Sequence, residues 1–139
     1  MAVVLDASLV VPLAVRDARV GLVDKAFRDL LDADEELHAP ALLLYEVASA
    51  LTRLVPGSAF DRDRLSSAWR RALALPIEYH DLSMGGERTV EIALQLGRKS
   101  AYDAAYLALA EHLDCSVLTL DGSLARNGTS QGFAVRLLT

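Results

Sequence analysis

The chain has 139 residues, of which 53% are hydrophobic and 24% are charged. This composition excludes a disordered or low-complexity chain and supplies enough apolar side chains for the core of one domain. The net charge of −5, from 19 acidic and 14 basic residues, argues at first against a simple phosphate-binding nucleic-acid module, because such modules are usually basic.

Strands and helices alternate from the N-terminus. Residues 2–5 form a Val-rich run that is apolar on both faces, which predicts a fully buried strand. A short helical stretch follows from Ser8. Apolar side chains recur on one face of residues 19–31, which predicts a second helix, and a brief strand is expected at 36–39.

Pro40 fits the first turn of a third helix, which runs to about Leu54 and ends before Pro56-Gly57. Either Asp61 or Asp63 could cap the next helix. The remaining elements are a helix through 69–75, a strand at 77–79, a helix at 87–96 ended by Gly97, a helix at 101–113 capped by Ser100, a strand at 116–120, a turn at Asp121-Gly122 and a strand at 133–137. Strands separated by helices predict right-handed βαβ units and a mostly parallel sheet covered on both faces.

The cysteine and histidine content and the N-terminal segment exclude several classes of protein. One cysteine, Cys115, excludes a disulfide framework within the chain, and the three histidines lie far apart, at positions 38, 80 and 112, with no zinc-binding spacing. Asp6 interrupts the apolar N-terminus, no basic segment precedes it, and no apolar run approaches the length of a membrane span. We therefore expect a soluble, cytoplasmic protein without a membrane association.

Four acidic residues occupy suggestive positions. Asp6 follows the first strand and Asp121 follows the fourth, and ligands bind at the carboxyl ends of parallel strands. Asp103 and Glu46 lie on helices. Purely structural roles also fit the first three: a cap of the following turn for Asp6, a capping box with Ser100 for Asp103, and a turn before glycine for Asp121.

Glu46 differs because its helical neighbours Leu42, Leu43 and Ala50 are apolar, and no Lys or Arg lies three or four residues away. A carboxylate on such a face is solvated, paired, protonated or bound to a metal. Several carboxylates in one pocket repel each other unless a cation is present, and oxygen ligands suit Mg²⁺ or Mn²⁺ rather than Zn²⁺.

Three segments carry a resemblance to a known family: VVLDAS at the start, P-x-L-x-x-x-E-V-x-x-A-L in the middle, and SAYDAAYLALAE followed by LTLDGSL. They resemble the PIN-domain nucleases, and most closely the VapC toxins of bacterial type II toxin–antitoxin systems. The resemblance covers essentially the whole chain, so we expect a single PIN domain over residues 1–139. It implies a three-layer α/β/α sandwich with a mostly parallel central sheet.

The resemblance also implies site residues and partners. By position, Asp6, Glu46 and Asp103 match the three acidic metal-site residues, and Asp121 matches a more variable fourth. Ser8 and Thr119 match supporting polar positions near the metal. Members of the family are Mg²⁺- or Mn²⁺-dependent endoribonucleases, often homodimers, that a VapB-type antitoxin holds inactive.

The mechanistic hypothesis is hydrolysis of an RNA phosphodiester by metal-activated water, with no side-chain nucleophile. Ser8 lacks a histidine nearby in the sequence to activate it, so it is interpreted as a hydrogen-bond partner of Asp6 or a helix cap. Arg98, Lys99 and Arg126 lie near the inferred pocket in sequence and are candidate RNA-binding residues, although ordinary solvated charges are the alternative.

Other functions stay open at this point. A non-catalytic PIN-like module that binds RNA or a partner has the same sequence features apart from catalysis. A phosphoacceptor receiver domain would need a second acid near Asp6 and a lysine after its last strand, whereas the only lysines are Lys25 and Lys99. A haloacid-dehalogenase-like phosphatase would need D-x-D where this chain has Asp6-Ala7-Ser8.

Overall fold

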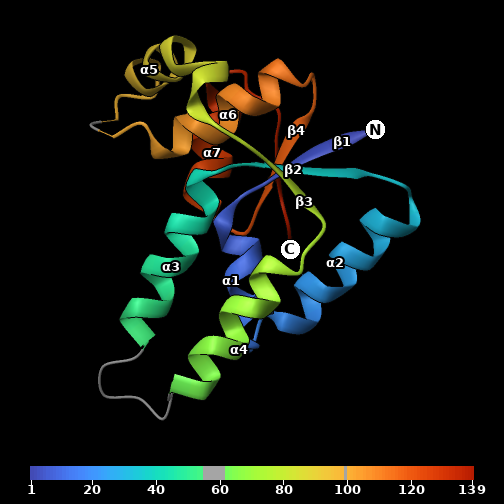
Figure 1. Cartoon of the computed structure of the whole chain (residues 1–139). Coiled ribbons are helices and arrows are strands. Elements are labelled where there is room, and N and C mark those ends of the chain that lie inside the picture. The colour runs from blue at the N-terminus through green and yellow to red at the C-terminus, as the bar shows by residue number, and fades with distance from the viewer. Residues whose placement is uncertain (55–61, 99) are drawn as a thin grey trace.

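A parallel β-sheet forms the centre of the molecule in this computed structural model, which describes residues 1–54, 62–98 and 100–139 (Figure 1). The strands in these residues are β1 (Ala2–Leu5), β2 (Glu36–Pro40), β3 (Ile77–His80), β4 (Ser116–Thr119) and β5 (Val135–Leu137). Their order across the sheet is β3-β2-β1-β4-β5, and every neighbouring pair is parallel. The expected mostly parallel sheet is confirmed.

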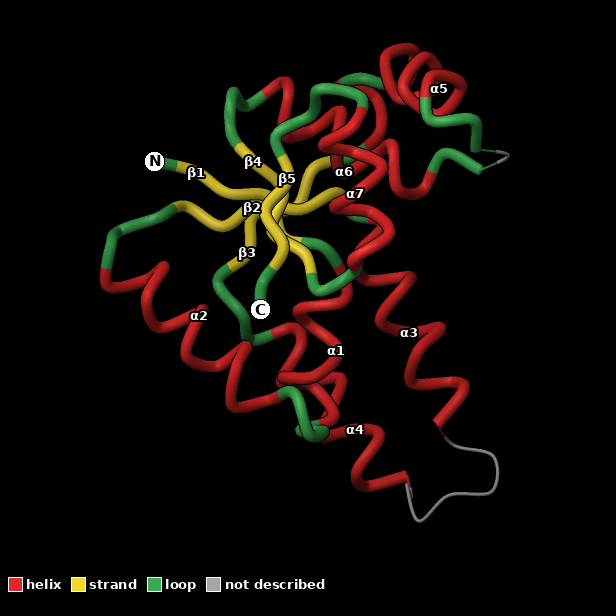
Figure 2. Tube along the Cα trace, turned by 180° about the vertical axis from the view of Figure 1, so that it is seen from behind, coloured by secondary structure: helices red, strands yellow, loops and turns green. Residues whose placement is uncertain are grey.

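Helices cover both faces of this sheet, as the view from behind shows (Figure 2). They are α1 (Ala7–Val15), α2 (Val20–Asp32), α3 (Leu42–Leu54), α4 (Arg62–Leu73), α5 (Gly86–Gln95), α6 (Tyr102–His112) and α7 (Gly122–Ser130), with a short 3-10 helix at Leu82–Met84. Alternate residues of the central strand enter two separate cores. Val3 packs in the core that contains Phe27 of α2, and Val4 packs in the core that contains Leu107 of α6. The result is the expected α/β/α arrangement.

The chain changes direction across the sheet between β1 and β4. The strands β2 and β3 are added on one side of β1, and the chain then returns to place β4 on its other side. The backbone N–H of Asp6 donates to the carbonyl of Leu118 at 3.1 Å, so the carboxyl ends of β1 and β4 lie together. In open α/β sheets this switch point is where ligands bind.

Three local predictions are wrong. Pro40 is the last residue of β2 rather than the first turn of a helix, and α3 begins at Leu42. Ser100 does not cap α6, because Ala101 occupies the N-cap position without a side-chain hydrogen bond. Asp121 and Gly122 do not form an isolated turn. Asp121 is the N-cap of α7. The sequence does not predict this helix, because it contains residues of low helix propensity such as Gly128.

Other predictions have simpler outcomes. Gly97 ends α5 as expected, with a positive φ of 68° that glycine adopts without strain. The helix α4 spans Arg62–Leu73, whereas the predicted Asp61 cap and Pro56-Gly57 stop lie outside the described residues. Within the described residues, every helix is too short or too polar to span a membrane.

Candidate active site at the carboxyl edge of the sheet

The carboxylate of Asp6 is buried at the switch point, with only 7% of the residue exposed. Its Oδ2 accepts hydrogen bonds from the Ser8 hydroxyl at 2.6 Å and from the Thr119 hydroxyl at 2.8 Å. Each hydroxyl in turn accepts from a backbone N–H of the segment after β4, Leu120 for Ser8 and Asp121 for Thr119, both at 2.9 Å. This network joins the ends of β1 and β4 and fixes the orientation of the carboxylate.

The network leaves one oxygen of Asp6 available. Among the described residues, all side-chain and backbone hydrogen bonds to this carboxylate end on Oδ2. Both hydroxyls donate their protons to Oδ2 and accept backbone N–H groups, so the donor and acceptor partners of each hydroxyl are defined. Asp6 thus combines a structural role, as N-cap of α1, with an Oδ1 that can bind a ligand.

Glu46 lies on α3 and is half-buried, which explains its apolar helical surroundings. Its Oε1 accepts a hydrogen bond from the Tyr106 hydroxyl of α6 at 2.8 Å. Burial raises the pKa of Glu46, the Tyr106 bond opposes that rise, and repulsion from Asp6 and Asp103 adds to it. The ionised form of Glu46 is therefore destabilised by the other acids, and a cation placed among them would stabilise it.

Asp103 lies in the first turn of α6 and is also half-buried. Burial raises its pKa, the Arg98 guanidinium opposes this, and repulsion from Asp6 and Asp121 adds to the rise. Arg98 lies 3.9 Å from the Asp103 carboxylate. The backbone N–H of Arg98 donates to the Ala93 carbonyl at 2.9 Å, in the turn that ends α5.

Asp121 is exposed and caps α7 by accepting the backbone N–H of Ser123 at 2.8 Å. Arg126 lies one turn further along α7, and its guanidinium rests against Gly122, where a Cβ atom would lie 3.0 Å from its Nη1. A positive charge therefore lies against the first residue of α7, which follows the fourth acid in sequence. Lys99, the third expected RNA-binding residue, lies outside the described residues.

The four acids share one edge of the sheet without converging tightly. Among the described residues, no three carboxylates place their oxygens within 4.8 Å of one another. The buried Tyr106 hydroxyl donates to Glu46, and the Arg98 guanidinium lies beside Asp103. An all-oxygen donor set with repelling charges fits a hard divalent cation such as Mg²⁺ or Mn²⁺.

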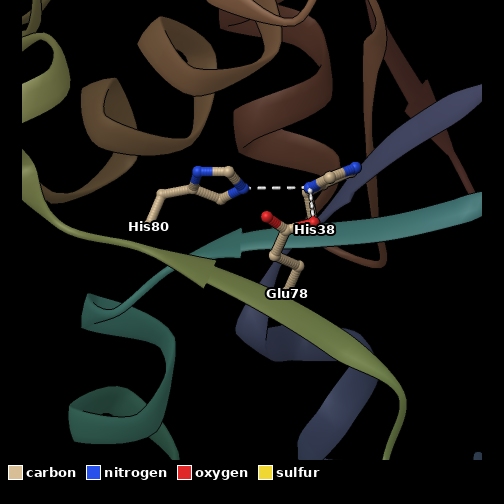
Figure 3. Close-up of side chains that lie close together, drawn as sticks. All are labelled: His38, Glu78 and His80. Carbon is tan, nitrogen blue, oxygen red and sulfur yellow. Dashed lines mark hydrogen bonds and ion pairs between the residues drawn. The ribbon is translucent and has the colours of Figure 1, made fainter.

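Two features were not found from the sequence. The first is Tyr106, which is buried in the core and whose hydroxyl donates to the Glu46 carboxylate. Its position three residues after Asp103 on one helix face was the available signal. The second feature is a cluster of His38, Glu78 and His80, shown in Figure 3, whose members the spacing argument treated as unrelated.

Comparisons with known proteins show which family the chain is similar to. The PIN-domain sequence model matches residues 3–129. Ribonuclease VapC9 of Mycobacterium tuberculosis is 36% identical over 137 residues, which cover 93% of each chain. Ribonuclease VapC3 of Pyrobaculum aerophilum is 33% identical over 129 residues, covering 90% of this chain and 93% of that protein.

Solved structures share the fold. VapBC2 from Rickettsia felis, bound to a promoter DNA fragment, superposes with a TM-score of 0.71 at 12% identity and covers 100% of both chains. VapC20 of Mycobacterium tuberculosis, a sarcin–ricin-loop-cleaving toxin, gives a TM-score of 0.65 at 16% identity over 95% of this chain and 96% of that one.

The fold and the edge of acidic side chains define an α/β/α protein with a carboxylate site at its switch point. The chain belongs to the PIN-domain family, and within it to the group of the VapC ribonucleases. The resemblance noted in the sequence motifs is thereby confirmed.

Replacing Thr119 by Val tests whether the Thr119 hydroxyl orients the Asp6 carboxylate for metal binding in addition to stabilising the fold. The change keeps the shape but removes one hydrogen bond to the buried Asp6 carboxylate, at a cost of about 1–3 kcal/mol in the free energy of unfolding. We expect divalent-metal affinity, measured by calorimetry, to fall about 10–100-fold. Thr119→Ser keeps the hydroxyl and should restore affinity, so equal losses in both variants would contradict the positioning role.

The raised pKa values of Glu46 and Asp103 predict how stability depends on pH without metal. Raised folded-state values favour the protonated form, so their stabilising contribution is complete below the ordinary carboxyl pKa and is lost as pH rises through the raised one. In EDTA, we expect Glu46→Gln to raise Tm by a few degrees at neutral pH and to have no effect below about pH 4.

Glu111 provides a control, because its pKa is shifted in the opposite direction to that of Glu46. Its hydrogen bonds with Arg88 lower its pKa, so Glu111→Gln should leave Tm unchanged or lower it at neutral pH. Thermal melts followed by circular dichroism measure both variants. A lower Tm for Glu46→Gln at neutral pH would contradict the predicted repulsion.

Proposed function

We propose that this chain is a metal-dependent endoribonuclease that hydrolyses RNA phosphodiester bonds as the toxin of a VapBC-type toxin–antitoxin pair. One observation carries the proposal: carboxylates from four separate segments lie along one edge of the sheet, near enough for Glu46 and Asp103 to have pKa values raised by their neighbours, in a chain that belongs to the VapC group. The proposed catalytic unit is the single PIN domain of residues 1–139.

In this proposal Asp6, Glu46 and Asp103 hold Mg²⁺ or Mn²⁺, and Asp121 assists from the exposed side of the site. The donor chemistry supports this assignment, because the site contains carboxylates and lacks the sulfur and imidazole ligands that softer metals prefer. When bound, the ion supplies a Lewis acid for the phosphate and activates water for attack.

The side chains of the protein orient the reacting groups. The hydroxyls of Ser8 and Thr119 hold Asp6, and the Tyr106 hydroxyl holds Glu46. Ser8 is unsuited as a nucleophile, because its hydroxyl donates to Asp6 and accepts the N–H of Leu120. Water is therefore the proposed nucleophile.

Binding of the RNA backbone is assigned to the positive charges at the rim of the site. Arg98 lies beside Asp103, and Arg126 lies beside Gly122 at the start of α7. Lys99 follows Arg98 in sequence and is proposed for the same role on that basis. Such guanidinium groups match phosphate geometry and also reduce the repulsion that RNA meets at an acidic edge.

The proposed partners are a VapB-type antitoxin and a second copy of the chain, in the cytoplasm. An apolar cavity of about 340 Å³ lies between α3, α5 and α6, and its lining includes the exposed side chains of Tyr45, Leu82 and Tyr102. Tyr102 directly precedes Asp103. An amphipathic antitoxin segment seated there would cover the approach to the site, which suits inhibition of the toxin.

Asp103→Asn tests the catalytic assignment. Removing one proposed metal-binding carboxylate should reduce cleavage of a mixed cellular RNA pool by at least about 100-fold while the fold is retained. The measurement is RNA cleavage with Mg²⁺ or Mn²⁺, with EDTA as the negative control and circular dichroism as the folding check. Expression of the wild type should arrest growth, and Asp6→Asn should relieve the arrest.

Full activity of Asp103→Asn would refute the assignment. A wild-type chain that binds metal and RNA but cleaves none of the cellular RNAs would favour the alternative of a non-catalytic PIN-like binding module. A matched control is Asp114→Asn, an exposed acid in the turn after α6, which should leave cleavage unchanged.

RNA binding should depend on the divalent ion. The four site acids account for four of the five net negative charges, so the rest of the chain is nearly neutral. Two divalent ions would cancel these four charges. With the wild type and a fluorescent RNA, we expect stopped-flow anisotropy, read before cleavage proceeds, to show at least about tenfold weaker binding in EDTA than in Mg²⁺. Equal affinity would contradict this.

A further inference from the structure

A second group of side chains with potential metal-binding atoms, separate from the four acids, lies on the strands β2 and β3. His38 of β2 pairs in register with Glu78 of β3, and His80 follows two residues later on the same face. The Nδ1 atom of His38 lies 2.9 Å from Nε2 of His80 and 3.7 Å from Oε2 of Glu78. Figure 3 shows the Glu78 and His80 side chains directed toward the His38 ring.

The surroundings of His38 orient it for metal binding. His38 is 5% exposed, and its other nitrogen, Nε2, lies 3.3 Å from Oε2 of Glu36. A proton on Nε2 donates to that carboxylate and leaves the Nδ1 lone pair directed at His80 and Glu78. Metal-binding histidines characteristically donate their second N–H to a carboxylate in this way.

We propose that His38, His80 and Glu78 form a site for a divalent transition-metal ion, of which Zn²⁺ is the reference case. One potential ligand atom from each of the three residues lies within 4.8 Å of the other two. Two nitrogens on tetrahedral zinc lie about 3.3 Å apart, so a small rotation of the His80 ring accommodates the ion. Two imidazoles and one carboxylate form a zinc donor set with a fourth position for water.

This site is chemically distinct from the acidic edge. Imidazole ligands favour Zn²⁺ and related ions, whereas the carboxylates of Asp6 and Glu46 favour Mg²⁺ or Mn²⁺. A bound ion would join the edge strand β3 to β2 just before the turn in which Ala41 donates its N–H to the His80 carbonyl at 2.8 Å. Since α3 begins directly after that turn, the ion would stabilise the base of the helix that carries Glu46.

The test measures Zn²⁺ binding to the full chain by calorimetry, and Co²⁺ binding by visible absorption. With excess Mg²⁺ present to occupy the acidic edge, we expect one Zn²⁺ per chain, a tetrahedral Co²⁺ spectrum, and an increase in Tm on adding Zn²⁺. His80→Gln and Glu78→Gln should each weaken Zn²⁺ binding at least about tenfold and abolish the Tm increase. Both residues are less buried than His38, so their variants are the safer choice for folding.

His112→Gln is the matched control, because it removes the third histidine of the chain, which is exposed on α6. It should leave Zn²⁺ binding unchanged, and Asp6→Asn should do the same. Unchanged Zn²⁺ affinity in folded Glu78→Gln and His80→Gln would overturn the proposal. So would loss of Zn²⁺ binding in an Asp6→Asn variant that circular dichroism shows to be folded, because that result would place the ion at the acidic edge.

Discussion

The buried carboxylate of Asp6 is the constraint on which the site depends. A charge at the end of a central strand is costly to bury unless it is hydrogen-bonded, and here two hydroxyls from different segments meet that need. Because Ser8 and Thr119 also accept the backbone N–H groups after β4, the carboxylate links β1 to a strand 113 residues away. The same bonds that stabilise the fold leave one carboxylate oxygen free for a ligand.

Glu46 and Asp103 differ from Asp6, because their surroundings destabilise the ionised carboxylate. Burial and mutual repulsion raise the pKa of Glu46 and of Asp103, so the folded chain bears unfavourable charge density at this edge. Tyr106 and Arg98 reduce that cost only in part. Functional sites commonly hold such unfavourable charge, and the cation proposed for this site would offset the repulsion.

Structural and functional roles are therefore not alternatives in this protein. Asp6 and Asp121 both cap helices, although the purely structural interpretation of the sequence predicted a cap only for Asp6 and a turn for Asp121. Both follow strands at the carboxyl edge of the sheet, where the active site is proposed. An N-cap uses one carboxylate oxygen for backbone N–H groups, which leaves the other to face the solvent or a ligand. Sequence patterns that favour a cap cannot separate the two roles.

The local errors have local causes. Pro40 is tolerated in a first helical turn and also at the end of a strand, so its residue type does not decide between them. The helix α7 is rich in residues with low helix propensity, and packing stabilises it: Gly128 is buried so close to Val135 that a Cβ atom would lie 2.7 Å from its Cγ2. Propensity alone cannot reveal a helix that tertiary contacts stabilise.

From the amino-acid sequence alone come the alternation of strands and helices, the parallel sheet, and the acids that follow strands or interrupt apolar helix faces. These follow from local periodicity and from the burial cost of charge. Only the tertiary structure brings His38 to His80, which lie 42 residues apart, and Tyr106 to Glu46, which lie 60 apart. Such pairs depend on which strands become neighbours and on how a helix rotates against the sheet, and the period of a single segment does not encode either.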